Sequence, residues 1–134
     1  EALVLGRETA FGQPINEIYQ DVFTLEADLI EVKLKPSMPE GKIGMNAFGE
    51  IPIFRDLGLM KRGIIALGRQ DVDFHELNPM DHTIRLIGSS SDHIIVDLTH
   101  STIDYQVGDV LSFQLSYGSL LSLMTSQYVK KVYI

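Results

Sequence analysis

The groups most capable of chemistry stand together in the stretch "SSSDH", residues 89–93. Hydroxyl, carboxylate and imidazole are the groups of a hydrolytic triad. Successive residues of an extended strand point to opposite faces, however, so neighbours in a strand cannot assemble one. The alternative is a polar turn whose side chains bond to the local backbone. The residues alone favour the turn, and they leave open that it presents donors to a ligand.

A metal site is the second kind of chemistry to consider. "DVDFH" places Asp71, Asp73 and His75 at alternate positions, which could present three ligands on one strand face. A solvated loop is the favoured alternative, because no H-x-H or H-E-x-x-H spacing occurs among the four histidines, His75, His82, His93 and His100. The chain has no cysteine, which excludes disulfides and thiolate ligands and is consistent with a cytoplasmic protein.

Composition narrows the class of protein. The 134 residues suffice for one domain with a core, and 45% of them are hydrophobic. A net charge of −7 with only 11 Lys and Arg argues against nucleic-acid binding. No apolar run approaches the roughly 20 residues that span a bilayer. Because Glu1 is not Met and an apolar run follows it at once, we expect a piece of a longer chain.

The elements that must position these groups are mostly strands. "ALVLG" is short and apolar throughout, which predicts a strand buried on both faces. "FTLEADLIEVKLK" alternates apolar and polar residues up to Leu29, and the apolar set then shifts to Ile30, Val32 and Leu34. This phase change predicts a bulge, or a bend from one sheet to another.

The remaining chain adds further short elements. "HELNPMDHT" is expected to be a turn, and Leu120, Leu121 and Met124 have the spacing of a short helix. Other strands are expected around Pro52 at an edge, over 64–67, 83–88, 93–99 and 110–115, and in "YVKKVYI". The sequence therefore predicts a mainly β domain, barrel- or sandwich-like, with one or two short helices.

Six segments in this order resemble the carboxyl-terminal part of the alanine racemase family of pyridoxal-phosphate (PLP) enzymes, closest to the amino-acid racemase branch that includes ornithine racemase. They are "LGRET", "FTLEADLIEVK", "GMNAFGEIP", "KRGIIALGRQDVD", "IGSSSDHIIVDLT" and "YGSLLSLMTSQYVKKVY". The resemblance implies a fold-type III enzyme, in which a (β/α)₈ barrel precedes a β-rich domain. Residues 1–20 would be the end of that barrel and its connecting segment, and residues 21–134 the β-rich carboxyl-terminal domain.

The resemblance also implies an activity and partners. The enzyme would be a PLP-dependent amino-acid racemase, a homodimer in which this domain completes the substrate pocket of the neighbouring subunit. The lysine that forms the Schiff base and the arginine that faces the pyridine nitrogen belong to the barrel and are not in this chain. This piece is therefore not expected to racemise its amino-acid substrate alone. Neither nucleic acid nor membrane is an expected partner.

Site residues follow from the resemblance position by position. Ser91 and Asp92 stand where the family has a Met-Asp pair, at the substrate-carboxylate end of the pocket. Arg69 replaces a tyrosine of the entrance segment, where it would suit a carboxylate-bearing ligand unless Asp71 neutralises it. Tyr117 matches the tyrosine that bonds the cofactor phosphate, a charge-assisted contact. Glu1 would contribute a backbone N–H at the phosphate-binding turn.

The main departure from the family lies in "GMNAFG". Asn46 occupies the approximate position of the catalytic tyrosine, and an amide cannot exchange a proton at a useful pKa. The alignment is shifted there, or another group such as Tyr105, His93 or Asp92 supplies the second base, or the chemistry is one-sided. A different class stays open as well, a non-catalytic β-barrel module that binds a partner or small ligand. The genomic sequence upstream of Glu1 would separate the two classes.

Overall fold

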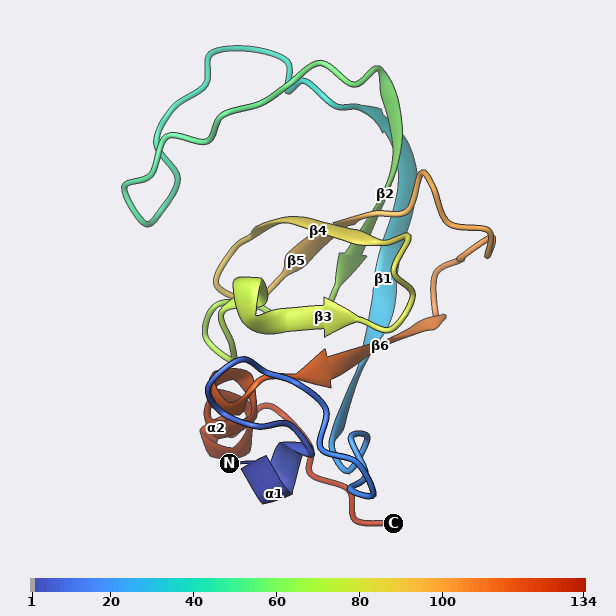
Figure 1. The fold of residues 1–134 in the computed structure, drawn as a ribbon. Helices are drawn as coiled ribbons and strands as arrows, with labels where there is room; N and C mark the ends of the chain where they lie inside the picture. The colour runs from blue at the N-terminus through green and yellow to red at the C-terminus, as the bar shows by residue number, and fades with distance from the viewer. Residues whose placement is uncertain (1) are drawn as a thin grey trace.

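The computed structural model describes residues 2–134, and its main feature is one six-stranded antiparallel sheet (Figure 1). The strand order is β3-β6-β1-β2-β5-β4. The strands are β1 (Thr24–Pro36), β2 (Leu59–Ile65), β3 (Leu77–Pro79), β4 (Arg85–Ser89), β5 (Ile94–Asp97) and β6 (Val110–Leu115). A 3₁₀ turn, η1 (Phe74–Glu76), precedes edge strand β3 and contacts the other edge strand, β4. The sheet is thus nearly closed into a barrel, as the mainly β prediction anticipated.

The long strand β1 joins the two halves of this sheet. Its first part, Thr24 to Asp28, pairs with β6, and its second part, from Leu29 onward, pairs with β2. The register shifts between Leu29 and Glu31, so the predicted bulge is confirmed. Of the apolar set beyond the bulge only Val32 packs against the core, whereas Ile30 and Leu34 stay exposed. The bulge lets one strand serve two pairings by changing its direction.

The core lies inside the curved sheet. Leu25 and Ala27 of β1 face inward and stand opposite Phe113 and Leu111 of β6 in the register. Phe113 is completely buried. A fully buried side chain of this size contributes roughly 1.5–3 kcal/mol relative to an exposed one, so this pairing anchors β6 to β1.

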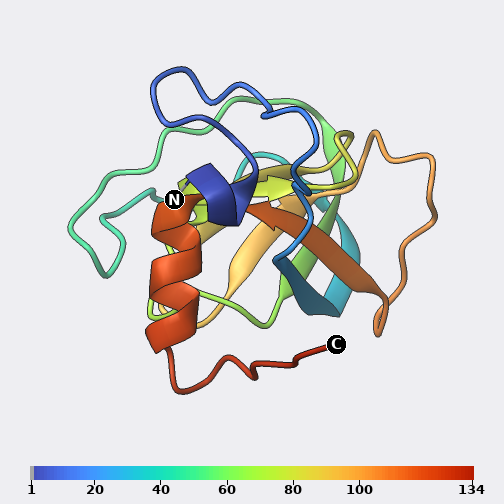
Figure 2. The same cartoon turned by 60° about the horizontal axis from the view of Figure 1, so that its bottom comes forward.

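Two helices lie at one end of the barrel (Figure 2). They are α1 (Ala2–Leu5) and α2 (Tyr117–Thr125), and residues 5–20 cross the same end as a loop. Ser116 caps α2: its hydroxyl accepts from the Ser119 N–H, and the Ser119 side chain accepts from the Ser116 N–H. This capping box fixes where the helix starts. No helix within residues 2–134 is long and apolar enough to cross a membrane.

Two of the predicted strands are wrong at the ends of the chain. "ALVLG" forms the four-residue helix α1, in which no side chain is buried. No described strand runs beside it, so its backbone groups bond locally in a helical turn. "YVKKVYI" is not a strand either, and Tyr128, Val132 and Tyr133 remain exposed. The segment pairs with neither of the two edge strands of the sheet, β3 and β4.

Two further expectations fail in the middle of the chain. No strand forms around Pro52, because residues 37–58 make one long loop in which Gly41, Gly49 and Gly58 adopt positive φ. The segment predicted as a turn, residues 75–83, contains the end of η1 and the edge strand β3. Pro79 ends β3 and is tolerated there because an edge strand needs only one side of its backbone for the ladder.

The loop 37–58 is anchored at its base. Ser37 is buried, its N–H donates to the Gly58 carbonyl at 2.8 Å, and its hydroxyl accepts from the Leu57 N–H at 2.6 Å. Loops of this length without secondary structure are uncommon and are usually either functional or linker segments, and this one is held at both ends. The contacts made by its tip therefore matter for the site.

Candidate functional site

The stretch "SSSDH" is a turn between β4 and β5 that is organised around Asp92. The Asp92 Oδ1 accepts from the hydroxyls of Ser90 at 3.2 Å and Ser91 at 3.1 Å, and it lies 3.3 Å from His93 Nδ1. The Ser90 hydroxyl also accepts from the His93 N–H at 3.1 Å. The Ser91 and Ser90 hydroxyls, together with the nearby His93, hold the pKa of Asp92 below its usual range.

This geometry is the polar turn that the residues alone favoured, with a side-chain to backbone bond from the His93 N–H to Ser90. The side chains of the turn converge because the chain turns here instead of continuing as a strand. The carboxylate, and not the imidazole, lies between the other two groups. A triad needs the imidazole to take the proton of the serine, so the turn presents an ionised carboxylate and no activated nucleophile.

A second segment packs directly on the back of this turn. Arg69 N–H donates to the Ser90 carbonyl and Gln70 N–H to the Ser91 carbonyl, each at 2.9 Å. Gly68 makes the approach possible, because a Cβ added there would lie 2.3 Å from the Asp92 nitrogen. Glycine at position 68 thus allows two backbones to touch. The "LGRQD" and "SSSDH" segments form one unit.

Arg69 extends this unit to the tip of the loop 37–58. Its Nη2 donates to both carboxylate oxygens of Glu50, at 3.0 and 3.2 Å, and its Nε donates to the Ser89 hydroxyl at 3.2 Å. The guanidinium carbon also lies 4.3 Å from the centre of the Phe48 ring, a cation–π contact. One side chain therefore fastens the loop tip to the β4–β5 turn.

Asn46 shapes the loop tip and has no free side-chain oxygen. Its Oδ1 accepts from the N–H groups of Phe48 and Glu50, both at 3.0 Å, and its Nδ2 donates to Glu50 Oε2 at 2.8 Å. These bonds make an Asx-type turn. The amide of Asn46 and the guanidinium of Arg69 together hold the pKa of Glu50 below its usual range.

Four of the five predicted site residues thus meet in one connected cluster: Asn46, Arg69, Ser91 and Asp92. The structure adds Glu50 and Phe48, which the sequence analysis missed. No spacing signal marks them, since they reach Arg69 only through the path of a long loop. Asp71 is not the partner of Arg69; it is buried and accepts from the Ser126 hydroxyl at 2.7 Å, behind α2.

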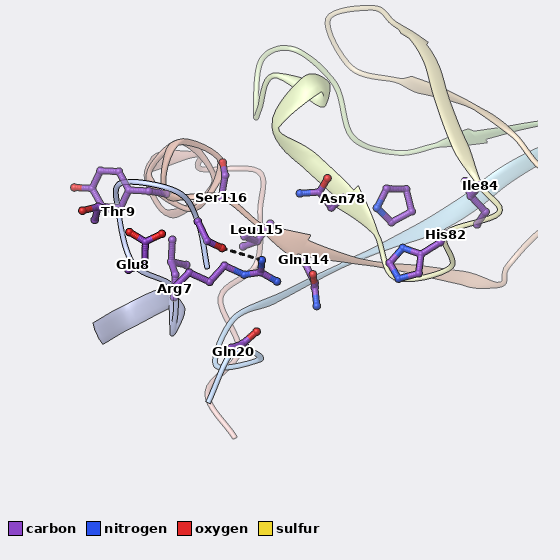
Figure 3. Close-up of a pocket in the computed structure, with 14 residues that line it drawn as sticks. Arg7, Glu8, Thr9, Gln20, Asn78, His82, Ile84, Gln114, Leu115 and Ser116 are labelled. Carbon is purple, nitrogen blue, oxygen red and sulfur yellow. Dashed lines mark hydrogen bonds between the residues drawn. The ribbon is translucent and has the colours of Figure 1, made fainter. Parts of the chain in front are cut away.

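Tyr117, the fifth predicted residue, lies in a different place. It lines an open groove of about 550 Å³ between residues 5–20, the β3–β6 edge and the start of α2 (Figure 3). Arg7 reaches into this groove, where its Nη1 makes a long 3.5 Å bond to the Gly12 carbonyl. Its neighbour Glu8 is instead occupied by backbone N–H groups, first of all that of Gln13, which lower the Glu8 pKa. The groove therefore presents a guanidinium and a phenol.

The start of α2 beside this groove is already taken by a carboxylate. Ser116 Oγ donates to Glu76 Oε2 at 3.0 Å, and a Cβ at Gly118 would collide with the same carboxylate. Glu76 thus complements the positive end of the helix. An anion in the groove has to be held by side chains and not by the helix end.

The remaining candidates serve the structure. Asp73 caps η1 by accepting from the His75 N–H and contacts the His75 ring nitrogen at 2.8 Å. Tyr105 is buried and donates to Asp81 at 3.1 Å. Within residues 2–134 no three His, Asp or Glu side chains are grouped so as to hold a metal ion. Glu1, expected at a phosphate-binding turn, lies outside the described residues.

Comparison with known proteins gives the context of this geometry. No protein-family model matches the chain. The chain is 47% identical to ornithine racemase of Acetoanaerobium sticklandii over 131 residues, and 47% identical to lysine racemase of Thermotoga maritima over 133 residues. The predicted resemblance to the amino-acid racemases is confirmed. The alignments cover 98% and 99% of this chain, which spans 37% of the length of each relative.

The fold has a relative among solved structures as well. Alanine racemase from Acinetobacter baumannii matches with a TM-score of 0.52 and 18% sequence identity. The match covers 78% of this chain and 33% of that chain. At this identity the likeness shows a shared fold, and it agrees with the predicted mainly β domain.

Proposed function

We propose that this chain is the carboxyl-terminal domain of a PLP-dependent racemase for amino acids with a basic side chain, completing the substrate pocket across a homodimer interface. The observation that carries the proposal is the 47% identity to an ornithine racemase and a lysine racemase over almost the whole chain. Residues 1–20 would end and connect a barrel domain, and 21–134 would form the β domain. The protein would act in the cytoplasm.

The groove at Tyr117 has the donor chemistry that a phosphate group requires. The Tyr117 phenol and the Arg7 guanidinium are donors suited to a dianion. Glu8, which lines the groove, and Glu76, which bonds the lining residue Ser116, already accept bonds from the protein. These two donors would hold the phosphate of PLP. When bound, the cofactor would supply the electron sink that makes the α-proton of the amino acid removable.

The β4–β5 turn would form the substrate end of the pocket. Asp92 is ionised and exposed there, and Ser91 holds it in place. An exposed carboxylate can pair with the ammonium group of a substrate. Asn46 would shape the loop beside it without carrying a proton, because an amide does not titrate in this range. The base on this face would then be a different group from the family's tyrosine.

Exposed apolar side chains on the loop 37–58 support a partner surface. Met45, Ile51 and Ile53 are 70%, 69% and 93% exposed. Apolar groups gathered on one projecting loop are typical of a contact with another domain or subunit. The neighbouring subunit and the barrel domain are the partners that the proposal requires.

The test is to prepare the full-length protein that contains this chain, add PLP, and record both its visible absorbance and its action on a panel of L-amino acids. We expect a bound-cofactor band and loss of optical rotation with ornithine or lysine, and less with alanine or serine. A protein that takes up no cofactor and racemises none of these would overturn the proposal and favour a non-catalytic module.

A further inference from the structure

The charge of Arg69 is already balanced inside the protein. Its side chain is 26% exposed, and its hydrogen bonds go to Glu50 and to the Ser89 hydroxyl while Phe48 covers one face. An arginine at a pocket mouth would ordinarily attract a carboxylate-bearing ligand. Here a carboxylate of the protein occupies that place.

Glu50 is brought to Arg69 by the fold of the loop. The Asn46 amide donates to one Glu50 oxygen, the Glu50 N–H donates to Asn46 Oδ1, and the Asn46 N–H donates to the Glu50 carbonyl at 2.8 Å. Both ends of the contact are therefore fixed: the turn at Asn46 sets Glu50, and two bonds to residues 89–90 set Arg69. The pair is a built contact between two rigid turns and not a chance meeting of long side chains.

We propose that Glu50 is a specificity-determining residue: by occupying the Arg69 guanidinium it prevents the pocket from accepting amino acids with an acidic side chain. This inference rests on the proposed function, since it concerns the same pocket. Glu50 acts through Arg69 and does not itself need to touch the substrate.

Asp92 of the β4–β5 turn also disfavours ligands with an acidic side chain. With Arg69 neutralised, the ionised Asp92 leaves the surface of the turn negative. A second carboxylate approaching it is repelled, whereas an ammonium group is attracted. Removing the charge of Glu50 would free the guanidinium and reverse this preference.

The experiment measures L-glutamate binding to the full-length, PLP-loaded protein by calorimetry, comparing Glu50→Gln with the unchanged protein. We expect glutamate to bind Glu50→Gln at least about tenfold more tightly, the equivalent of one charge-assisted bond. The double variant Glu50→Gln with Arg69→Gln should lose this gain. Glu40→Gln is the matched control, since Glu40 is an exposed glutamate of the same loop that forms none of the salt bridges among the described residues.

Two results would overturn the inference. One is unchanged glutamate binding in Glu50→Gln, and the other is a gain that survives when Arg69 is also replaced. If Glu50→Gln does not fold, the charge exchange Glu50→Arg with Arg69→Glu keeps an ion pair and should still reject glutamate; glutamate binding by that variant also counts against the inference. A protein that takes up no PLP and racemises nothing refutes the proposed function, whereas a PLP-loaded protein that shows no turnover still reports whether Glu50 controls glutamate binding.

Discussion

Gly68→Ala is the substitution that tests the packing of the site most directly. The added carbon would lie 2.3 Å from Asp92 N and 2.4 Å from both Asp92 Cα and Ser91 C. All three are backbone atoms, so no flexible side chain can move aside. The turn at residues 89–93 has to shift as a whole, and it is held in place by the bonds from Arg69 and Gln70.

The size of the effect follows from this overlap. Ordinary contact begins at 3.4 Å, so the closest atom is about 1 Å too near, an overpacking that costs about 1–3 kcal/mol. For a domain of this length that loss lowers the melting temperature by about 3–10 °C. The shift also moves Ser91 and Asp92, so we expect KM for the amino acid to rise as well.

Thermal unfolding followed by circular dichroism measures the change in melting temperature. Steady-state kinetics of the full-length protein measures the change in KM. Gly88→Ala is the matched control, because a Cβ at Gly88 would meet nothing within 4 Å. It should change stability by less than about 0.5 kcal/mol. Equal melting temperatures for the two variants would refute the close approach of Gly68 to the turn.

Three other substitutions probe separate contacts. Asp97 is 1% exposed, and although burial opposes its ionisation, bonds such as that from the Thr99 hydroxyl at 2.5 Å hold its pKa below the usual range. The Asp97 carboxylate therefore stabilises the fold above its unfolded pKa of about 3.9, and this contribution is lost as the pH falls through the folded pKa. Asp97→Asn should lower the free energy of unfolding in urea at pH 7 by about 1–3 kcal/mol and should weaken the loss of stability in acid. An unchanged dependence of stability on acid pH would contradict this. Burial and the bond to Asp81 raise the pKa of Tyr105, so alkaline spectrophotometric titration should show one tyrosine that ionises late, and Tyr105→Phe should abolish that phase; a late phase that persists points to another residue. If the groove holds phosphate, Tyr117→Phe should weaken PLP retention by the full-length protein about 10- to 100-fold in a fluorescence titration, and unchanged retention would exclude this role.

The sequence was informative where local pattern and packing agree. The alternation in β1 and its phase change at Leu29 predicted both the strand and its bulge, because burial of one face dictates side-chain period. The helix at α2 followed from apolar spacing in the same way. The two strands predicted at the chain ends were wrong because an apolar run also needs a neighbouring strand to pair with. The sequence pattern does not show whether such a strand is available.

The candidate site likewise contains residues that the sequence identified and residues that it did not. The resemblance to the racemases named Ser91, Asp92 and Arg69 as site residues, and backbone bonds between residues 69–70 and 90–91 hold their two segments together. Glu50 was not found because its partner is 19 residues away along the chain, and Glu50 itself lies in a loop without regular geometry. The charge of Arg69 could therefore be read from the sequence, but its neutralisation could not.

The bulge in β1 also separates two sets of strand pairs that differ in how far apart the paired strands lie along the chain. Beyond it, β1, β2, β5 and β4 come from one stretch that ends at Asp97. Before it, Thr24 has to find Gln114, a closure over most of the chain. Closing a longer loop costs more conformational entropy before the contacts that offset this cost can form. Pairing of β6 with β1 should therefore be the slow step in folding. The bulge then marks the junction where a sheet formed from nearer segments is completed by a distant one.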